Sequence, residues 1–128
     1  MVGRLCSASL SLKVGSRMDQ RIEFVIGLMR NRIHQDLTID DLALSVYLSR
    51  WHFSHLFKDE VGVSPAHYLK SLKMDEAKRL LETSPMSVKE IMFRLRIKDK
   101  SHFERDFKKT YGLTPVQYRL TNFLKLSE

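Results

Sequence analysis

Two groups of hydrogen-bonding and basic side chains lie about 50 residues apart in the chain, and their chemistry suits the edges of nucleic-acid bases. Arginine can hold a guanine through two hydrogen bonds, histidine and serine can donate to or accept from base edges, and an indole can lie against a thymine methyl. The two groups consist of Trp51, Ser54 and His55, and of Lys100, Ser101, His102 and Arg105. Such side chains can reach a base only if the elements that carry them point them outward.

An internal repeat places the two groups at equivalent positions. Residues 57–68 align with residues 107–118 at an offset of 50, and residues 37–42 align with residues 86–91 at an offset of 49. Glycines, prolines and helix-capping residues match between the copies. A period of this length predicts one supersecondary unit that is built twice.

Each copy is predicted to begin with a short helix followed by a second one. Thr38 with Asp41, and Ser87 with Glu90, have the spacing of a capping box, in which a hydroxyl accepts from the third amide and the acid reaches back. A polar residue then caps the second helix and a glycine ends it, since glycine tolerates positive φ. The caps are Ser49 and Asp99, and the glycines are Gly62 and Gly112.

A third helix follows in both copies, and in the first copy it is long. Ser64-Pro65 and Thr114-Pro115 each supply an N-cap followed by proline at the first helical position. The first of these helices can run over residues 65–83 until Ser84-Pro85 stops it, which makes it a rigid link between the units. A leading amphipathic helix is predicted from about Asp19 to His34. Because no alternating strand pattern is present, we expect an all-α fold.

The second helix of each copy has an apolar face and a polar face, as a helix-turn-helix requires. Phe53 and Phe57 define the core direction in the first copy, and Phe103 and Phe107 define it in the second. Trp51 lies opposite the core and should therefore meet a partner molecule. The alternative is that its indole folds sideways against the leading helix, because tryptophan is usually largely buried.

Positive charge is concentrated in the C-terminal half. The chain carries 22 Lys and Arg against 15 Asp and Glu, for a net charge of +7, and residues 67–128 hold 14 of the basic residues against 8 acidic ones. This asymmetry favours a polyanionic partner, either nucleic acid or an acidic membrane surface. No membrane span is predicted, because Lys and Arg interrupt every hydrophobic run. Phosphate contacts are predicted for Arg50, Lys58, Lys98, Lys108, Lys109 and Arg119.

No feature of the sequence points to catalysis. The chain has no phosphate-binding glycine loop, no nucleophile elbow and no pair of acids with a histidine at catalytic spacing. A zinc site on His52, His55 and His102 is not expected, because no cysteine or further ligand has a workable spacing. We therefore predict that the chain is no enzyme and needs no metal or cofactor. The single cysteine, Cys6, excludes an internal disulfide and fits a reducing cytoplasm.

Many of these residues also carry a family resemblance over about residues 19–120. In the first copy and the linking helix they are Leu42-Ala43, Ser49, Leu56-Phe57-Lys58, Gly62, Ser64-Pro65, Tyr68-Leu69 and Ala77-Lys78-Arg79-Leu80-Leu81. In the second copy, whose motif is highly specific, they are Ile91, Ser101-His102-Phe103, Arg105, Phe107-Lys108-Lys109, Gly112, Thr114-Pro115 and Tyr118-Arg119. The pattern closely resembles the DNA-binding region of AraC/XylS-type transcription regulators.

The resemblance implies a fold of seven helices, with two helix-turn-helix subdomains in a homeodomain-like tandem joined by a long central helix. It implies that the two recognition helices enter successive major grooves of double-stranded DNA, where the two groups of side chains named at the outset meet bases. It also implies a cytoplasmic regulator that binds a promoter and contacts RNA polymerase. The expected segments are a linker or tail at 1–17, a first subdomain at 18–66, the linking helix at 65–83 and a second subdomain at 84–123.

Three questions stay open at this point. The turn glycine usual in the family is Arg96 in the second unit, and Tyr47 stands at the corresponding turn of the first. If these turns need positive φ, each non-glycine residue costs about 1 kcal/mol; otherwise the turn bends differently. The family commonly has a separate sensor or dimerisation domain, so the chain is either a small self-sufficient regulator or part of a longer protein. The alternative function is a helical protein-interaction module that uses the Trp51 face, and its binding would respond less to salt.

Overall fold

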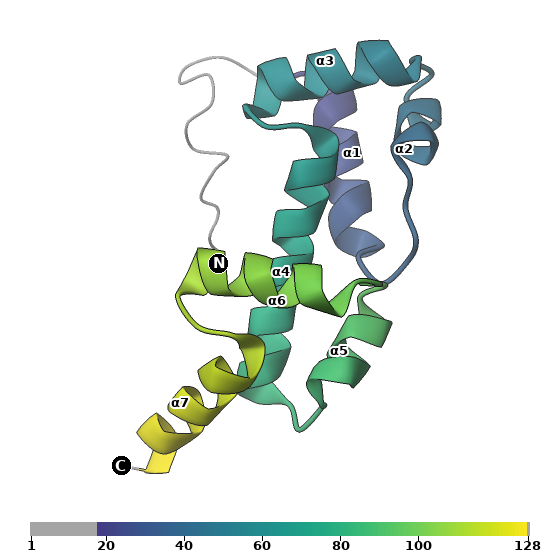
Figure 1. The fold of residues 1–128 in the computed structure, drawn as a ribbon. Helices are drawn as coiled ribbons and strands as arrows, with labels where there is room; N and C mark the ends of the chain where they lie inside the picture. Colours follow the sequence, from purple (N-terminus) through teal and green to yellow (C-terminus); the bar gives the residue numbers. More distant parts are fainter. Residues whose placement is uncertain (1–17, 128) are drawn as a thin grey trace. The chain divides into compact units, whose positions relative to one another are not determined.

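Seven α-helices and no strand make up residues 18–127, the part of the chain that a computed structural model describes (Figure 1). The helices are α1 (Gln20–Asn31), α2 (Ile39–Ser45), α3 (Arg50–Val61), α4 (Pro65–Thr83), α5 (Val88–Arg94), α6 (Lys100–Tyr111) and α7 (Pro115–Ser127). The predicted all-α fold of seven helices is confirmed. The predicted linker or tail at 1–17 lies outside the described residues. Over the described range, every helix is too short or too polar to cross a lipid bilayer.

The capping residues predicted from the sequence begin the short helices. Thr38 and Ser87 each accept a hydrogen bond from the third amide of their helix. The side chains of Asp41 and Glu90 in turn accept one from the backbone N–H of the cap residue, so both capping boxes are formed. Ser87 N donates to Glu90 Oε1 at 3.0 Å, and the bonds with Ser87 hold the pKa of Glu90 below its usual value. Local sequence thus fixes where α2 and α5 start.

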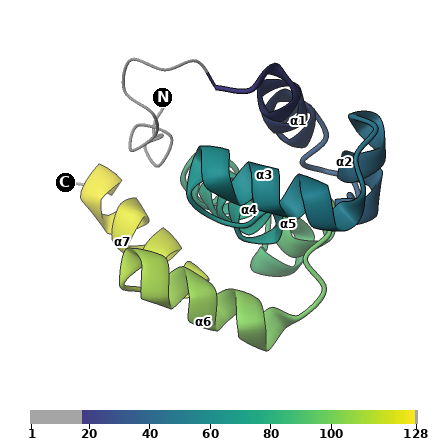
Figure 2. The same cartoon turned by 90° about the horizontal axis from the view of Figure 1, so that it is seen from above.

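Two compact units make up the chain, with their boundary between Ser71 and Leu72, and α4 runs through this boundary as one helix of 19 residues. In the first unit, α3 packs against both α1 and α2 (Figure 2). The side chains that hold the three helices together are fully buried: Ile22, Val25, Met29, Leu42, Phe53 and Phe57. This core orients α3.

One buried carboxylate ties the end of α3 to the start of α1. Glu60 is only 4% exposed, and its Oε1 accepts a hydrogen bond from the backbone N–H of Asp19 at 2.6 Å. Asp19 in turn caps α1 by accepting from Arg21 N. At its other end α1 stops at Asn31, short of the predicted His34, because Arg32 has a φ of −115° and leaves the helical conformation.

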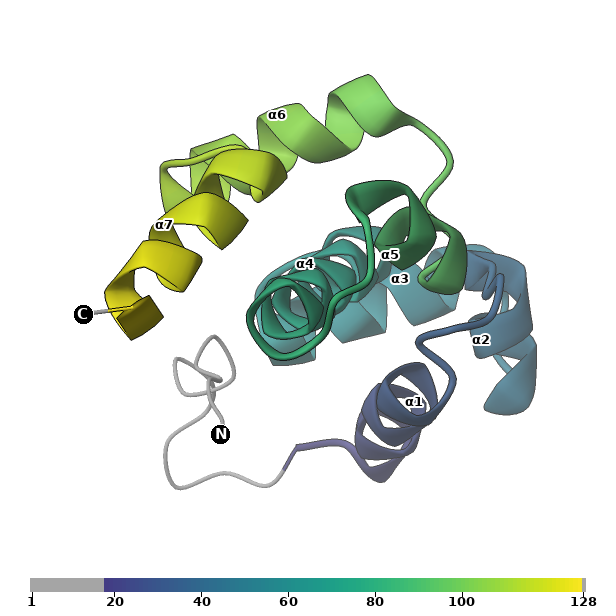
Figure 3. The same ribbon diagram turned by 90° about the horizontal axis from the view of Figure 1, so that it is seen from below.

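In the second unit, α6 and α7 lie side by side and are joined by the turn at Gly112 (Figure 3). Ile91, Leu95, Phe103 and Phe107 are buried here and repeat the core of the first unit. Tyrosine hydroxyls fasten α6 and α7 to α4. Tyr111 donates to Asp75 Oδ1 at 2.6 Å, and Tyr118 donates to Glu82 Oε2.

Candidate nucleic-acid interface

The orientation of α3 is set by its caps and its two phenylalanines. Ser49 Oγ accepts from His52 N at 3.1 Å and starts the helix, while Gly62 ends it in the left-handed conformation with a φ of 97°. Phe53 and Phe57 have no solvent exposure. Because side chains on the opposite side of a helix then face outward, α3 presents a polar face to solvent.

Trp51 stands on this outward face and is 70% exposed. Its ring lies 4.0 Å from that of His55, centroid to centroid, with an interplanar angle of 31°. The alternative in which the indole folds against the leading helix is therefore wrong. A tryptophan this exposed, with its ring beside that of a residue one turn away, leaves most of its apolar surface available to a partner.

A hydrogen bond to the helix backbone orients His55. Its Nδ1 lies 2.9 Å from the carbonyl oxygen of Trp51. A carbonyl only accepts, so Nδ1 carries the proton, and Nε2 of the neutral ring is left as an acceptor. The imidazole thus presents an acceptor beside the indole of Trp51.

The remaining predicted contact residues of the first unit differ in their exposure and in their ion pairs. Ser54 is half-buried, whereas Lys58 is exposed on the outward side. Arg50 is exposed too, but its Nη1 lies 3.6 Å from Asp40 Oδ2 in a surface ion pair. Exposed pairs of this kind are weak, so the guanidinium can leave Asp40 for a stronger anion such as a phosphate.

The second unit builds its outward face in the same way on α6. Asp99 Oδ1 accepts from His102 N at 3.0 Å to start the helix, and Gly112 ends it with a φ of 85°. Phe103 and Phe107 are buried on the inner side. Four predicted base-contacting residues are all exposed on the outer side or its flanks: Lys100, Ser101, His102 and Arg105.

Among the described residues, the guanidinium of Arg105 makes one weak hydrogen bond. Its Nε lies 3.5 Å from the carbonyl oxygen of Ser101, at the limit of a hydrogen bond. The two terminal nitrogens form no hydrogen bond with any described residue. They are therefore available as the pair of donors that reads a planar acceptor edge.

The predicted phosphate-contacting residues divide into two kinds. Lys98, Lys108 and Lys109 are exposed at or beside α6. Arg119 is instead half-buried, and it donates to the carbonyl oxygens of Leu81 at 3.3 Å and Ser84 at 3.1 Å. These bonds join α7 to the end of α4, a structural role that sequence reasoning missed because it depends on a contact across more than 30 residues.

Within residues 18–127, histidine, cysteine and carboxylate side chains form no cluster of three or more that could hold a metal ion. The outward faces of α3 and α6 consist of donors, acceptors, cations and one indole. These are groups that bind a polyanion or its bases rather than groups that carry out a reaction.

A family model described as a helix-turn-helix domain matches residues 42–121, which run from α2 into α7 and include both outward faces. The chain belongs to the AraC-type helix-turn-helix family. The residues that carried the resemblance in the sequence are thus those of an AraC-type domain. Domains of this family are DNA-binding parts of transcription regulators and are not enzymes.

Individual relatives agree with this assignment. The uncharacterized HTH-type transcriptional regulator YtdP of Bacillus subtilis (strain 168) is 32% identical over 111 residues, which cover 84% of this chain and 14% of YtdP. The C-terminal domain of AraT, a response regulator from Geobacillus stearothermophilus, superposes with a TM-score of 0.76 at 30% sequence identity. The alignment covers 83% of this chain and 88% of the AraT chain. The DNA-binding domain of AdpA, a global transcriptional factor, was solved in complex with a target DNA and superposes with a TM-score of 0.77 at 27% sequence identity. The alignment covers 82% of this chain and 95% of the AdpA chain.

The AraC-type chain spans only part of the curated relatives that it matches. It covers 14% of YtdP and 34% of a second relative. What those longer proteins do beyond this domain therefore does not transfer to the present chain.

Proposed function

We propose that this AraC-type domain binds double-stranded DNA at specific sequences and thereby regulates transcription, with α3 and α6 entering successive major grooves. The observation that carries the proposal is the pair of outward faces, each held by two buried phenylalanines and each with exposed hydrogen-bonding and basic side chains. An α-helix fits the major groove of B-form DNA, where every base pair presents a distinct pattern of donors and acceptors.

The two helices would use different chemistry. On α3, Trp51 offers an apolar surface that suits a thymine methyl, and the acceptor Nε2 of His55 suits the amino group of an adenine or a cytosine. On α6, Arg105 offers two donors that suit the O6 and N7 atoms of guanine. Ser54, Lys100, Ser101 and His102 complete the proposed base-contacting set.

Backbone affinity would come mostly from the second unit. Eight basic and four acidic residues lie between Lys89 and Lys109, whereas residues 18–66 are net acidic. The proposed phosphate-contacting residues are Arg50, Lys58, Lys98, Lys108 and Lys109. Arg119 is left out of this set, because its guanidinium already donates hydrogen bonds to the carbonyl oxygens of Leu81 and Ser84.

We infer further that the domain acts in the cytoplasm at promoters and there contacts RNA polymerase. Support for this comes from the family resemblance and from relatives that are transcription regulators. The alternative, a protein-interaction module that uses the Trp51 face, is not favoured, because the family to which the chain belongs consists of DNA-binding domains.

The decisive experiment selects binding sites from random duplex DNA with the unaltered chain, Trp51→Ala and Arg105→Ala. The unaltered chain should enrich two short motifs, each variant should lose preference at one of them, and the affinity should fall steeply with salt. If all five proposed phosphate contacts form, log K should change with log[salt] with a slope of about −4.5. A selection that enriches no motif, or binding that is insensitive to salt, would contradict the proposal.

A further inference from the structure

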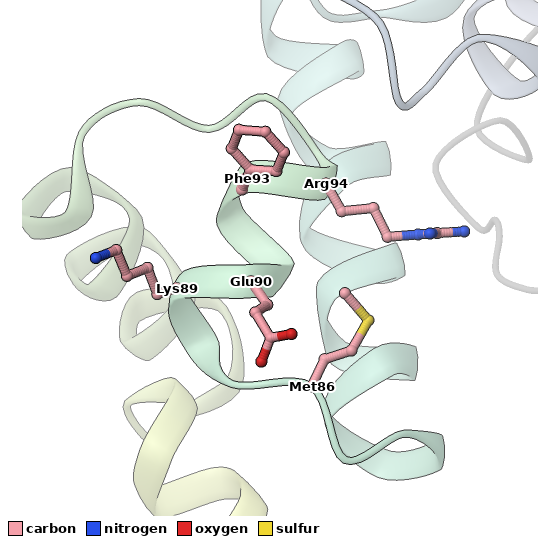
Figure 4. A pocket seen from close by; sticks show the side chains of 5 residues that line it. All are labelled: Met86, Lys89, Glu90, Phe93 and Arg94. Atoms are coloured by element: carbon pink, nitrogen blue, oxygen red, sulfur yellow. The ribbon is translucent and has the colours of Figure 1, made fainter.

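The second unit has an apolar hollow that no part of the proposed DNA contact uses. It lies along α5 and the residues just before it, has a volume of about 480 Å³, and is lined by Met86, Lys89, Glu90, Phe93 and Arg94 (Figure 4). Phe93 is 75% exposed. Pockets that hold small ligands fall in the same range of volume, so the hollow can seat an apolar side chain.

Two cations flank the hollow. Lys89 and Arg94 extend to opposite sides of it, with Phe93 and Met86 between them (Figure 4). Neither cation is paired with a carboxylate of any described residue. The guanidinium of Arg96 lies 5.8 Å from the centre of the Phe93 ring.

The one carboxylate that lines the hollow is already used. Glu90 Oε1 accepts a hydrogen bond from Ser87 N at 3.0 Å and completes the cap of α5. Its negative charge remains beside the hollow, so Lys89 and Arg94 together with Glu90 leave a net charge of about +1 around it.

The repeat supplies an internal comparison for this surface. The residues of the first unit 49 positions earlier are Leu37, Asp40, Asp41, Leu44 and Ser45. An exposed apolar residue is kept, because Leu44 is 70% exposed where Phe93 stands in the second unit. The two cations are replaced by Asp40 and Ser45, so the basic rim is specific to α5.

We propose that the hollow on α5 is a docking site for an acidic segment of a partner protein, which inserts one large apolar side chain beside Phe93 and places carboxylates against Lys89 and Arg94. The proposed partner matches the hollow in charge and polarity: its carboxylates would face the cations Lys89 and Arg94, and its apolar side chain would contact Met86 and Phe93. DNA phosphates would use the cations but gain nothing from an exposed phenylalanine and a methionine. Aromatic side chains combined with arginine are instead typical of the residues that dominate protein–protein binding.

The docking site is independent of the proposed DNA contact. None of its lining residues belongs to α6 or to the proposed base and phosphate contacts, although Lys89 and Arg94 add to the overall positive charge of the second unit. A partner bound there leaves the side chains of the recognition helix accessible. Failure to select a DNA sequence would therefore leave this inference standing, and failure of docking would leave DNA binding standing.

The test uses the full chain and two synthetic helical peptides. Both peptides carry phenylalanine and leucine one turn apart; one surrounds them with glutamates and the other with lysines. The acidic peptide should bind saturably, shift the amide resonances of residues 86–96, and bind at least about tenfold more tightly than the basic one. Phe93→Ser should weaken it about tenfold, whereas the matched variant Leu44→Ser on α2 should leave it unchanged.

A charge exchange makes the test specific. The double variant K89E/R94E should lose its affinity for the acidic peptide and should bind the basic peptide instead. All of these positions are exposed, so circular dichroism and the unfolding midpoint should match those of the unaltered chain, which separates loss of docking from loss of folding.

Three outcomes would overturn the inference. Equal binding of both peptides would show that no charge selection exists. If K89E/R94E lost affinity for random duplex DNA but bound both peptides as the unaltered chain does, Lys89 and Arg94 would be phosphate contacts and not part of a docking site. Self-association of the unaltered chain in sedimentation that Phe93→Ser abolishes would make a second copy the occupant.

Discussion

Tyr47 and Arg96 occupy the same turn of the duplicated unit, and both have a φ of 60°. The sequence left open whether a turn without glycine would bend differently, and it does not: both copies keep the left-handed conformation that favours glycine. A non-glycine residue in this region is strained, so each unit carries a local cost of about 1 kcal/mol. The guanidinium of Arg96 lies 5.8 Å from the centre of the Phe93 ring, while Tyr47 is 94% exposed.

Replacing Tyr47 by glycine should stabilise the chain. The substitution removes the strain and loses almost no buried surface, although glycine also makes the unfolded chain more flexible. We expect the free energy of unfolding in urea to rise by about 0.5–1 kcal/mol. Tyr47→Ala is the control, because alanine keeps the strain; an equal gain for alanine would show that backbone conformation is not the cause.

Trp51 and Phe53 are neighbours on α3 with opposite exposure, and their alanine variants should separate binding from folding. Trp51→Ala should weaken specific DNA binding by on the order of 1–2 kcal/mol and leave the unfolding midpoint unchanged. Phe53→Ala should destabilise the fold by about 3–5 kcal/mol, because the side chain has no solvent exposure. Fluorescence anisotropy and urea unfolding measure the two effects. Comparable destabilisation by both variants would contradict the outward position of the indole.

Arg105 and Lys108 should differ in what they contribute to DNA binding. Arg105→Ala should cost about 1–3 kcal/mol on the selected site and relax one base preference. Lys108→Ala should weaken all sequences about equally and reduce the salt slope by about 1. Titrations against the selected duplex and a scrambled one at several salt concentrations give both quantities. Equal losses of Arg105→Ala on the two duplexes would refute its role in reading a base.

The hydroxyl of Tyr118 should make stability depend on alkaline pH. Burial, together with the hydrogen bond to Glu82 and the charge of Glu82, raises the pKa of Tyr118 above its usual value. The folded chain thus retains this proton when the unfolded chain has lost it, so the contribution is fully present below about pH 10 and declines as the pH rises further. In Tyr118→Phe the decline above that pH should be shallower, and stability at neutral pH should fall by about 1–2 kcal/mol. A decline of unchanged steepness would show that other groups govern it.

Local chemistry made much of the fold predictable. The caps Thr38, Ser49, Ser87 and Asp99 act on amides within three residues of themselves, and all four form the bonds that their spacing predicts. The outward position of Trp51 follows from the same helical period that buries Phe53.

What sequence reasoning missed depends on contacts between distant segments. Arg119 looks like a surface cation, but its position in α7 brings it to the last carbonyls of α4. Glu60 looks like a solvated residue near a helix end, yet it reaches an amide 41 positions away. The hollow beside Phe93 combines residues whose types are ordinary for a helix surface, so only their packing distinguishes them.

The bond between Glu60 and the amide of Asp19 has a mechanical consequence. It anchors the point where the chain enters α1 directly to the last turn of α3, through one buried carboxylate. A tether, label or fused protein attached just ahead of Asp19 therefore pulls on the same helix that displays Trp51, and a force applied there reaches that helix without first passing through the body of the unit.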